Sequence, residues 1–236
     1  VLAVVGGDGT VHLGTNACAG TDVPLLVVPG GTGNDNARVL GLHRGELDTL
    51  AGLVTRGQVR RVDVGRSRTP DGDRWWLGVL GGGFDTRVND RGKRIRRLHG
   101  TARYLAAVAA ELPSFRGIPY AVEVDGVRHE TTAMLVAVGN GTSFGGGMQV
   151  CPDASMTDGL LDVMILHRVG RLEFLRIFPS VFSGGHVRHP AVQILRGRTV
   201  RLEAEGVRTT QADGEDFLPL PLELEVVPGA LAVLAP

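Results

Sequence analysis

Two short apolar runs near the start of the chain each lead into a glycine-rich segment. Residues 1–5 precede the segment 6–10, and residues 25–28 precede the segment 29–33. A fully apolar run of this length is typical of a buried strand in a parallel sheet. Helical patterns follow the two segments, at residues 13–19, 37–40 and 46–55. The alternation of strand, glycine loop and helix predicts an α/β unit.

From about residue 59 the pattern changes to short β-rich runs. They occupy residues 60–64, 74–80, 120–124, 127–132, 133–138, 160–166, 191–195, 199–204, 207–211 and 222–227. Asp125-Gly126 predicts a hairpin, because both central positions of a type I′ turn need a positive φ. Helices are expected at 101–112 and 172–178. Ten short strands predict an antiparallel sandwich or barrel over residues 58–236, with a domain boundary near Gly57.

The first apolar run stands at the very start of the chain, with no Met before Val1. A buried parallel strand needs neighbours on both edges, and only one other such run precedes Arg56. The pattern therefore predicts that residues 1–57 are the C-terminal part of an α/β domain. A missing N-terminal segment would supply its other strands.

Composition is that of a globular protein and argues against several classes of function. Hydrophobic residues make up 43% of the 236 residues and charged residues 21%. Lys and Arg (25) balance Asp and Glu (25), which argues against a nucleic-acid partner. Two cysteines form no disulfide framework, which favours a reducing cytoplasm. No apolar run reaches about 18 residues, so a membrane-spanning helix is not expected.

The two glycine-rich segments have the features of a phosphate site. Both should emerge at the carboxyl edge of the sheet, where ligands of open α/β sheets bind. Glycines let backbone N–H groups approach a phosphate, and Thr10 and Thr32 add hydroxyl donors. Each segment alone could be a tight turn, but two paired loops favour phosphate binding.

Several stretches together form a pattern more specific than either loop. They are Gly6-Gly7-Asp8-Gly9-Thr10, Pro29-Gly30-Gly31-Thr32-Gly33-Asn34-Asp35, Gly82-Gly83-Phe84-Asp85, Gly139-Asn140-Gly141, Gly145-Gly146-Gly147-Met148, Pro152-Asp153-Ala154, Asp158-Gly159-Leu160-Leu161-Asp162 and Asp213-Gly214-Glu215. In this order they resemble the diacylglycerol kinase catalytic domain family, especially its bacterial soluble lipid kinases, which are similar to sphingosine and ceramide kinases. The resemblance implies a partial NAD-kinase-like parallel α/β domain followed by an antiparallel β-sandwich domain. His12 stands where the family usually has Asn, a change that concerns one polar contact near the nucleotide.

The resemblance implies a site for ATP and Mg²⁺. The residues that would line the ATP phosphates are Gly6, Gly7, Asp8, Gly9, Thr10 and Thr32. Asp8, Asp35 and Asp63 would hold the reacting region and its Mg²⁺ through waters. Ser155, Asp158 and Leu160 resemble a second, structural Mg²⁺ site, for which an ordinary Asp-Gly turn is the alternative.

Asp213 and Glu215 would form the catalytic base pair. Phosphoryl transfer requires positioned donors, carboxylates for Mg²⁺ and a base for the attacking hydroxyl. The resemblance favours Glu215 as the base and Asp213 as its partner. From the residues alone, the choice between them stays open, and a solvated hairpin fits as well.

A basic segment precedes the helix expected at 101–112. Residues 87–99 contain one acid, Asp90, and six basic residues, Arg87, Arg91, Lys93, Arg94, Arg96 and Arg97. The segment fits a contact with anionic lipid head groups or a solvated loop equally well. The helix itself, with its apolar stripe of Tyr104, Leu105, Val108 and Leu112, is expected to pack in the core.

We expect a cytoplasmic lipid kinase that transfers the γ-phosphoryl group of ATP to diacylglycerol or a related lipid, with peripheral contact to an anionic membrane. A sphingoid kinase, a kinase of the polyphosphate or NAD type, and a non-catalytic nucleotide- or lipid-binding fragment are the alternatives. Asp213-Gly214-Glu215 on the β-rich domain favours a lipid substrate. A homodimer is left open, and a chain that lacks the family's first phosphate loop is expected to bind ATP weakly.

Overall fold

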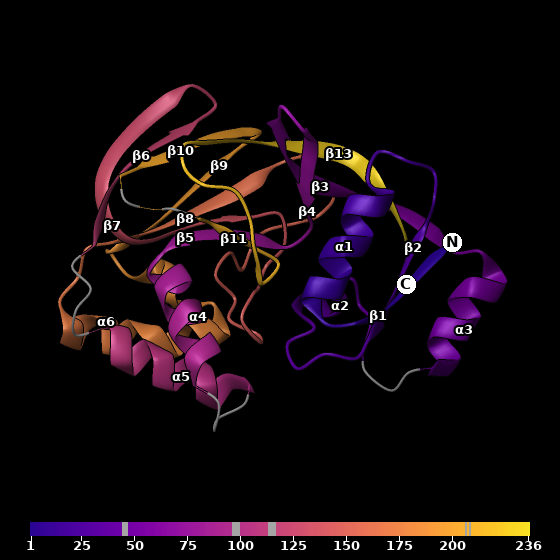
Figure 1. Ribbon diagram of the computed structural model, residues 1–236, viewed down its shortest axis with the longest axis horizontal. Helices are drawn as coiled ribbons and strands as arrows, with labels where there is room; N and C mark the ends of the chain where they lie inside the picture. Colours follow the sequence, from indigo (N-terminus) through magenta and orange to yellow (C-terminus); the bar gives the residue numbers. More distant parts are fainter. Residues whose placement is uncertain (44–46, 96–99, 113–116, 206, 208) are drawn as a thin grey trace.

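The computed structural model describes residues 1–236 except 44–46, 96–99, 113–116, 206 and 208. The described chain has an α/β part and a β-rich part that share one continuous sheet (Figure 1). Three helices, α1 (Asp8–Cys18), α2 (Asp35–Val39) and α3 (Leu47–Arg56), belong to the α/β part. Three more, α4 (Phe84–Arg94), α5 (Gly100–Glu111) and α6 (Arg171–Ile177), lie on one side of the β-rich part.

The two apolar runs form neighbouring parallel strands, as predicted. β1 (Leu2–Gly6) pairs with β2 (Leu25–Pro29), and Leu2 stands opposite Leu25. β2 is buried along most of its length, and Leu25 is fully buried. The expectation of burial is wrong for β1, because it lies at the end of the sheet order and the Val5 side chain is 71% exposed.

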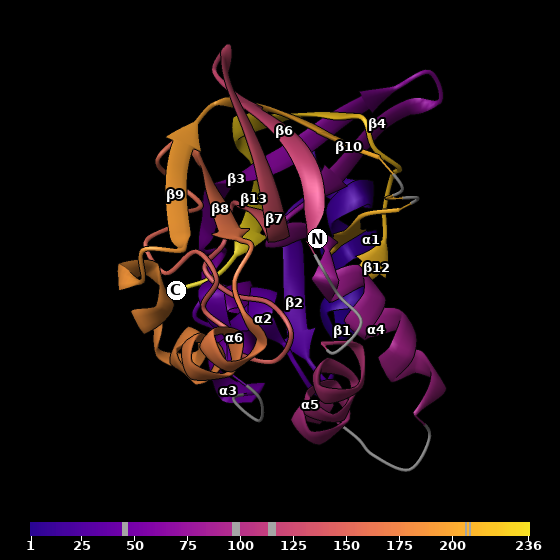
Figure 2. The ribbon, with the colours of Figure 1, turned by 90° about the vertical axis from the view of Figure 1, so that its left-hand side faces the viewer.

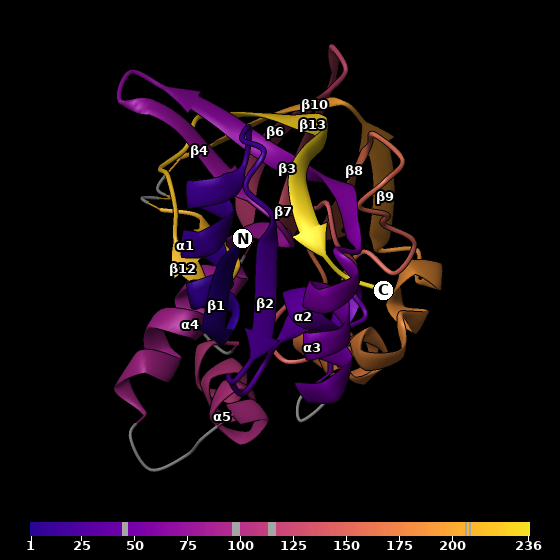
Figure 3. The same cartoon turned by 90° about the vertical axis from the view of Figure 1, so that its right-hand side faces the viewer.

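The other neighbour of β2 comes from the end of the chain. β13 (Leu222–Leu234) pairs with β2 in parallel at Val233 and with β3 (Val59–Thr69) in an antiparallel manner. A register shift lies between Val227 and Leu231, and the strand beyond it joins the apolar core of the α/β part. The sequence pattern ended this strand at residue 227. The domain boundary near Gly57 stays a prediction, and β13 is common to both parts (Figure 3).

The β-rich part is antiparallel throughout its described pairings. Its other strands are β4 (Gly72–Trp76), β5 (Val79–Gly83), β6 (Ile118–Val124), β7 (Val127–Gly139), β8 (Leu161–His167), β9 (Val192–Gly197), β10 (Thr199–Ala204), β11 (Gln211–Ala212) and β12 (Glu215–Asp216). The Asp125-Gly126 hairpin is confirmed, with φ values of 48° and 83° between β6 and β7. The runs at 127–132 and 133–138 form the single strand β7, whereas the run at 74–80 divides between β4 and β5.

A second apolar core fills the space between the sheet and the helices beneath it (Figure 2). α6 continues into the 3₁₀ helices η1 (Phe178–Ser183) and η2 (Gly185–Arg188). α5 and α6 agree with the predicted helices, and Val108 and Leu112 are buried. The side chains of Tyr104 and Leu105 lie outside the described ones.

The sequence pattern did not predict α4, which covers the first part of the basic segment 87–99. Its local sequence is polar, and the helix is stabilised by burying Phe84 and Val88 against the sheet. Tertiary packing therefore overrides a weak local preference. Arg91 Nε donates to Glu111 of α5 at 2.7 Å, and Arg87 lies 3.3 Å from the same carboxylate. Residues 96–99 lie outside the described residues.

No described helix has the length and apolar character needed to cross a membrane.

Candidate active site

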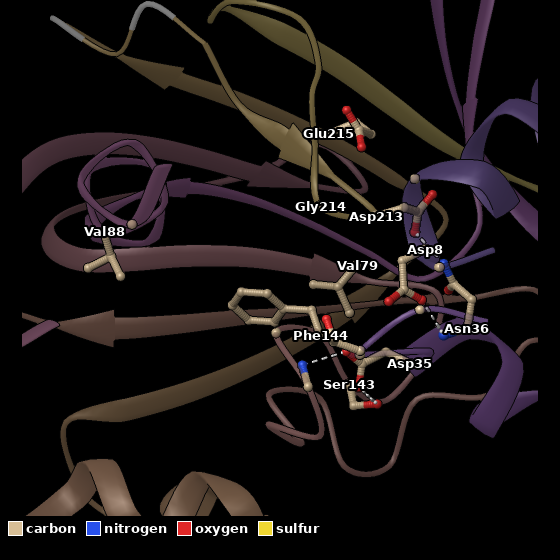
Figure 4. A pocket seen from close by; sticks show the side chains of 18 residues that line it. Asp8, Asp35, Asn36, Val79, Val88, Ser143, Phe144, Asp213, Gly214 and Glu215 are labelled. Atoms are coloured by element: carbon tan, nitrogen blue, oxygen red, sulfur yellow. Dashed lines mark hydrogen bonds between the residues drawn. The ribbon is translucent and has the colours of Figure 1, made fainter. Parts of the chain in front are cut away.

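A cavity of about 420 Å³ lies where the two parts of the chain meet. The α/β part contributes both glycine loops, and the β-rich part contributes β5, α4, the loop at 143–146 and the turn at 213–215. Four carboxylates line the cavity, those of Asp8, Asp35, Asp213 and Glu215 (Figure 4). No Lys, Arg or His is among the described lining residues. The cavity is therefore strongly acidic on one side, and a polyphosphate would need a cation to offset the repulsion between like charges.

The two glycine loops pack backbone against backbone at the carboxyl ends of β1 and β2. Gly30 N donates to Gly6 O at 2.8 Å, and Gly7 and Gly31 line the cavity side by side. A Cβ atom at Gly31 would overlap Gly7 Cα, so only glycine fits this contact. The loops are close enough to act as one surface.

Asp8 lies in the first turn of α1 and faces the second loop. Its Oδ1 accepts the Asn36 backbone N–H at 3.0 Å, and a Cβ at Gly33 would stand 2.9 Å from its Oδ2. Burial raises the pKa of Asp8, the Asn36 N–H opposes this rise, and the carboxylates of Asp35 and Asp213 add to it. The protein thus holds Asp8 where an added cation lowers the free energy of its ionised form.

Asp213 is buried and fully hydrogen-bonded. Its Oδ1 accepts Gly78 N at 2.7 Å and Asn36 Nδ2 at 3.2 Å. Its Oδ2 accepts Leu77 N at 3.0 Å and lies 3.1 Å from His12 Nδ1. Four partners from both parts of the molecule hold this carboxylate in place, so Asp213 is placed to organise the turn that carries Glu215.

Glu215 meets a different environment two residues later. Its side chain is exposed at the cavity, and its carboxylate reaches the N-terminal turn of α1. A Cβ at Gly9 would overlap Glu215 Oε1, which places the carboxylate directly against the first glycine loop. The turn thus brings a solvent-accessible carboxylate to the loop that the sequence assigns to the phosphates.

Asp35 holds the loop at 143–147 against the α/β part. Its carboxylate accepts Gly146 N at 2.7 Å, Gly147 N at 2.8 Å and Ser143 Oγ at 3.2 Å, and Arg38 donates to it at 2.7 Å. These partners occupy both oxygens. Asp35 is therefore placed to shape the cavity wall.

Three of the expected nucleotide-site residues do not line the cavity. Asp63 accepts Gly159 N and Gly229 N, each at 2.8 Å, and thereby connects β3 to the turn at Gly159 and to β13 at Gly229. Thr10 packs against Gly6, where a Cβ would overlap its hydroxyl. Gly6, Thr10 and Asp63 stay predictions as ATP-site residues, whereas Thr32 does line the cavity.

The three residues expected to form a second Mg²⁺ site lie together at the surface. Asp158 Oδ1 accepts Leu160 N at 3.0 Å, and Asp158 Oδ2 accepts Arg196 Nη2. Arg196 Nε also donates to Asp162 at 2.6 Å. A guanidinium already neutralises the carboxylate, so a divalent cation would have to displace Arg196. The second Mg²⁺ site at Ser155, Asp158 and Leu160 stays a prediction.

The described residues of the cavity do not form a metal site from protein ligands alone. Among the described residues, no three His, Cys, Asp or Glu side chains are arranged to hold an ion. Mg²⁺ in kinases usually keeps several waters and is bound by one or two carboxylates together with substrate phosphates. Asp8 and Glu215 fit that mode of binding, because their oxygen atoms suit a hard cation.

Asn36 is a site residue that the sequence analysis did not single out. It donates its backbone N–H to Asp8 and its amide to Asp213, so it joins the first glycine loop to the carboxylate turn. Its position directly after Asp35 in the second motif was the available signal. Ser143 and Phe144 were missed as well, because nothing local distinguishes them.

Comparison with known proteins adds two family models that match successive parts of the chain. The diacylglycerol kinase catalytic domain matches residues 1–67, and the YegS C-terminal NAD kinase beta sandwich-like domain matches residues 78–235. A diacylglycerol kinase of Mycobacterium tuberculosis is 41% identical over all of this chain and 76% of its own length. A probable YegS-like lipid kinase of Chromohalobacter salexigens is 30% identical over 98% of this chain and 74% of its own length.

Solved structures agree on the fold. A diacylglycerol kinase structure from Bacillus anthracis has a TM-score of 0.71 and 23% identity, covering 99% of this chain and 75% of its own. An NAD kinase from Archaeoglobus fulgidus in complex with ATP has a TM-score of 0.51 and 16% identity, covering 98% and 76%. The expected NAD-kinase-like α/β part followed by a β-sandwich is confirmed.

Proposed function

We propose, from the premise that this chain belongs to the diacylglycerol kinase family and is a lipid kinase, that it transfers the γ-phosphoryl group of ATP to the hydroxyl of diacylglycerol. One observation carries the proposal. The cavity joins a wall of glycine loops and carboxylates to a wall of apolar side chains. A kinase with a charged donor and a lipid acceptor needs both surfaces at one point.

The apolar wall comes from the β-rich part. Val79, Val88 and Phe144 line the cavity, and Figure 4 shows Val88 and Phe144 on the side away from Asp8 and Asn36. The glycerol end of a lipid would meet this wall while the nucleotide phosphates meet the loops. An NAD-type acceptor would instead need polar donors there, and the described lining residues on this side are mostly apolar or glycine.

The reaction requires one proton acceptor beside the phosphate loops. The lipid hydroxyl oxygen forms a bond to the γ-phosphorus, the bond from that phosphorus to the bridging oxygen breaks, and ADP leaves with the electron pair. The hydroxyl proton passes to a carboxylate. Mg²⁺, when bound, neutralises phosphate charge in the transition state.

Glu215 is the better supported base. Its carboxylate is accessible and lies against Gly9, whereas the Asp213 oxygens are occupied by four hydrogen bonds. A base must reach the proton that it accepts, and Asp213, although it lines the cavity, is only 4% exposed. Asp213 acts as a positioning residue in this proposal.

The test is a transfer assay with radiolabelled ATP and the full-length protein. Diacylglycerol, sphingosine and ceramide in mixed micelles, and NAD in buffer, are offered separately. We expect label in the diacylglycerol product and a loss of that product with Glu215→Gln. Glu205→Gln, an exposed carboxylate outside the cavity, is the matched control. Label in NAD or in the sphingoid alone would reject the proposed substrate.

A further inference from the structure

The segment formed by α6, η1 and η2 exposes large apolar side chains. Leu172 is 74% exposed, Leu175 53% and Phe182 37%. The same segment buries Phe174 and Ile177 in the core beneath the sheet. A surface helix normally has one apolar face, directed inward. Here a second apolar face points outward, and none of the described residues covers it.

The same stretch of chain carries exposed basic residues. Arg168, Arg176 and Arg188 are exposed, and Glu173 is the only acid within residues 168–189. Glu173 itself lies 3.7 Å from His189. The face therefore combines exposed leucine and phenylalanine with a marked excess of positive charge. This combination is typical of segments that bind the interface of an anionic membrane.

The inner side of the segment leads toward the catalytic cavity. Phe174, Ile177, Phe178 and Val181 line a small apolar cavity of about 50 Å³ together with Phe144. Phe144 also lines the catalytic cavity. Figures 1 and 2 show α6 on the same side of the β-rich part as α4, which contributes Val88 to that cavity. The apolar side chains on the inner side of the segment thus connect to the acceptor side of the site through Phe144.

We propose that α6, η1 and η2 form a surface that docks on an anionic bilayer. Leu172, Leu175 and Phe182 enter the boundary between head groups and acyl chains, and the arginines contact lipid phosphates. The inference rests on the proposed function, because a lipid acceptor is delivered from a bilayer. It places the contact at 168–188 instead of the basic segment 87–99, where Arg87 and Arg91 already pair with Glu111.

The test measures binding of the full-length protein to phosphatidylcholine vesicles with and without phosphatidylglycerol, by co-sedimentation. We expect binding only to the anionic vesicles. Leu172→Ser with Leu175→Ser should weaken it by at least about tenfold, because both side chains lose apolar burial in the interface. Val127→Ser, which removes a 59% exposed side chain at the distant β6–β7 hairpin, should bind like the wild type.

A second variant and a second readout separate docking from folding and from catalysis. Arg168→Gln with Arg188→Gln should reduce binding to anionic vesicles and leave the melting temperature unchanged. Phosphorylation of a short-chain diacylglycerol dispersed as monomers should be unaffected in all three variants. Unchanged vesicle binding in the leucine variant would overturn the proposal. A wild-type dimer that the leucine substitutions dissociate would overturn it too, since the face would then join two copies. If the wild type binds anionic vesicles but does not phosphorylate the short-chain diacylglycerol, the proposed function alone is rejected.

Discussion

Asp213 and Glu215 stand two residues apart, and the fold gives their carboxylates different surroundings. Asp213 has a φ of 54° and sends its carboxylate inward to backbone N–H groups of residues 77 and 78. Gly214 then turns the chain, with a φ of 83°, so that Glu215 faces the first glycine loop. The residues alone do not distinguish the two carboxylates, whereas in the structure hydrogen bonds enclose that of Asp213 and leave that of Glu215 accessible.

Substitutions at these two positions should therefore differ. Glu215→Gln keeps the size of the side chain but cannot accept a proton, so kcat should fall roughly 10²-fold or more with little change in KM for ATP and in Tm. Asp213→Asn turns an amide N–H toward existing donors, so it should cost about 1–3 kcal/mol of stability as well as activity. Thermal melting beside steady-state kinetics checks both. A stable, inactive Asp213→Asn and an active Glu215→Gln would give the base role to Asp213.

Asp8 couples stability to pH. Because burial raises its pKa above the ordinary value of 3.8, the folded protein binds a proton more tightly than the unfolded chain. This contribution to stability is present at low pH and declines as pH rises through the folded pKa. Asp8→Asn keeps an acceptor for the Asn36 N–H and removes the buried charge. It should melt higher than wild type at neutral pH and lose turnover.

The same variant supplies its own control across pH. The gain in Tm of Asp8→Asn over wild type should shrink as the pH is lowered below the folded pKa of Asp8, where wild type is protonated as well. A series of melting curves from acidic to neutral pH measures this difference. A gain that is independent of pH would contradict the assignment to the Asp8 carboxylate.

At the scale of elements, the two glycine loops form the site because β1 and β2 are adjacent and parallel. Their backbones meet at Gly7 and Gly31, where no Cβ fits. Gly31→Ala should push the loops apart, weaken ATP binding and cost about 1–3 kcal/mol of stability. Gly170→Ala is the matched control, since no atom lies within 4 Å of its Cβ position. Calorimetric titration with ATP and thermal melting report the two effects, and equal behaviour of both variants would refute the contact.

Arg196 decides whether Asp158 belongs to a metal site. The guanidinium bridges Asp158 and Asp162, and removing it leaves two neighbouring carboxylates without a counter-charge. Burial already raises the pKa of Asp162, which Arg196 counteracts. Arg196→Gln should lower Tm, and added Mg²⁺ should restore part of the loss. Any change in Tm that Mg²⁺ causes in the wild type should be the same in Asp158→Asn. An Mg²⁺ effect in the wild type that Asp158→Asn removes would instead support the metal site.

At the scale of the whole molecule, a few long-range connections hold the two parts around the cavity. β13 passes through both apolar cores, and Asp63 joins β3 to Gly159 and Gly229. Asp63→Ala leaves two partly buried N–H groups without their acceptor and should cost about 1–3 kcal/mol. Since Asp63 does not line the cavity, Tm should change more than the KM for ATP. Intact stability with a large loss of kcat would return Asp63 to the reacting centre.

Local patterns in the sequence were enough to predict several individual elements of this structure. Each apolar run with its glycine loop, and the Asp125-Gly126 hairpin, depend on backbone preferences and burial within a few residues. The order of the motifs was enough to predict the family and the sandwich. The residues alone left the choice between Asp213 and Glu215 open, because their local sequence does not distinguish them, and only the family resemblance favoured Glu215.

Tertiary contacts between distant residues decided the rest. α4 is a helix because Phe84 and Val88 pack under the sheet. The end of strand β13 pairs at Val233 with Leu25, some two hundred residues earlier in the chain. Asn36 joins the site through its hydrogen bond to Asp213, and Asp158 pairs with Arg196. Such contacts are worth little until the whole chain has folded, since the entropy of closing long loops must be overcome first. For that reason a local pattern carries no record of them.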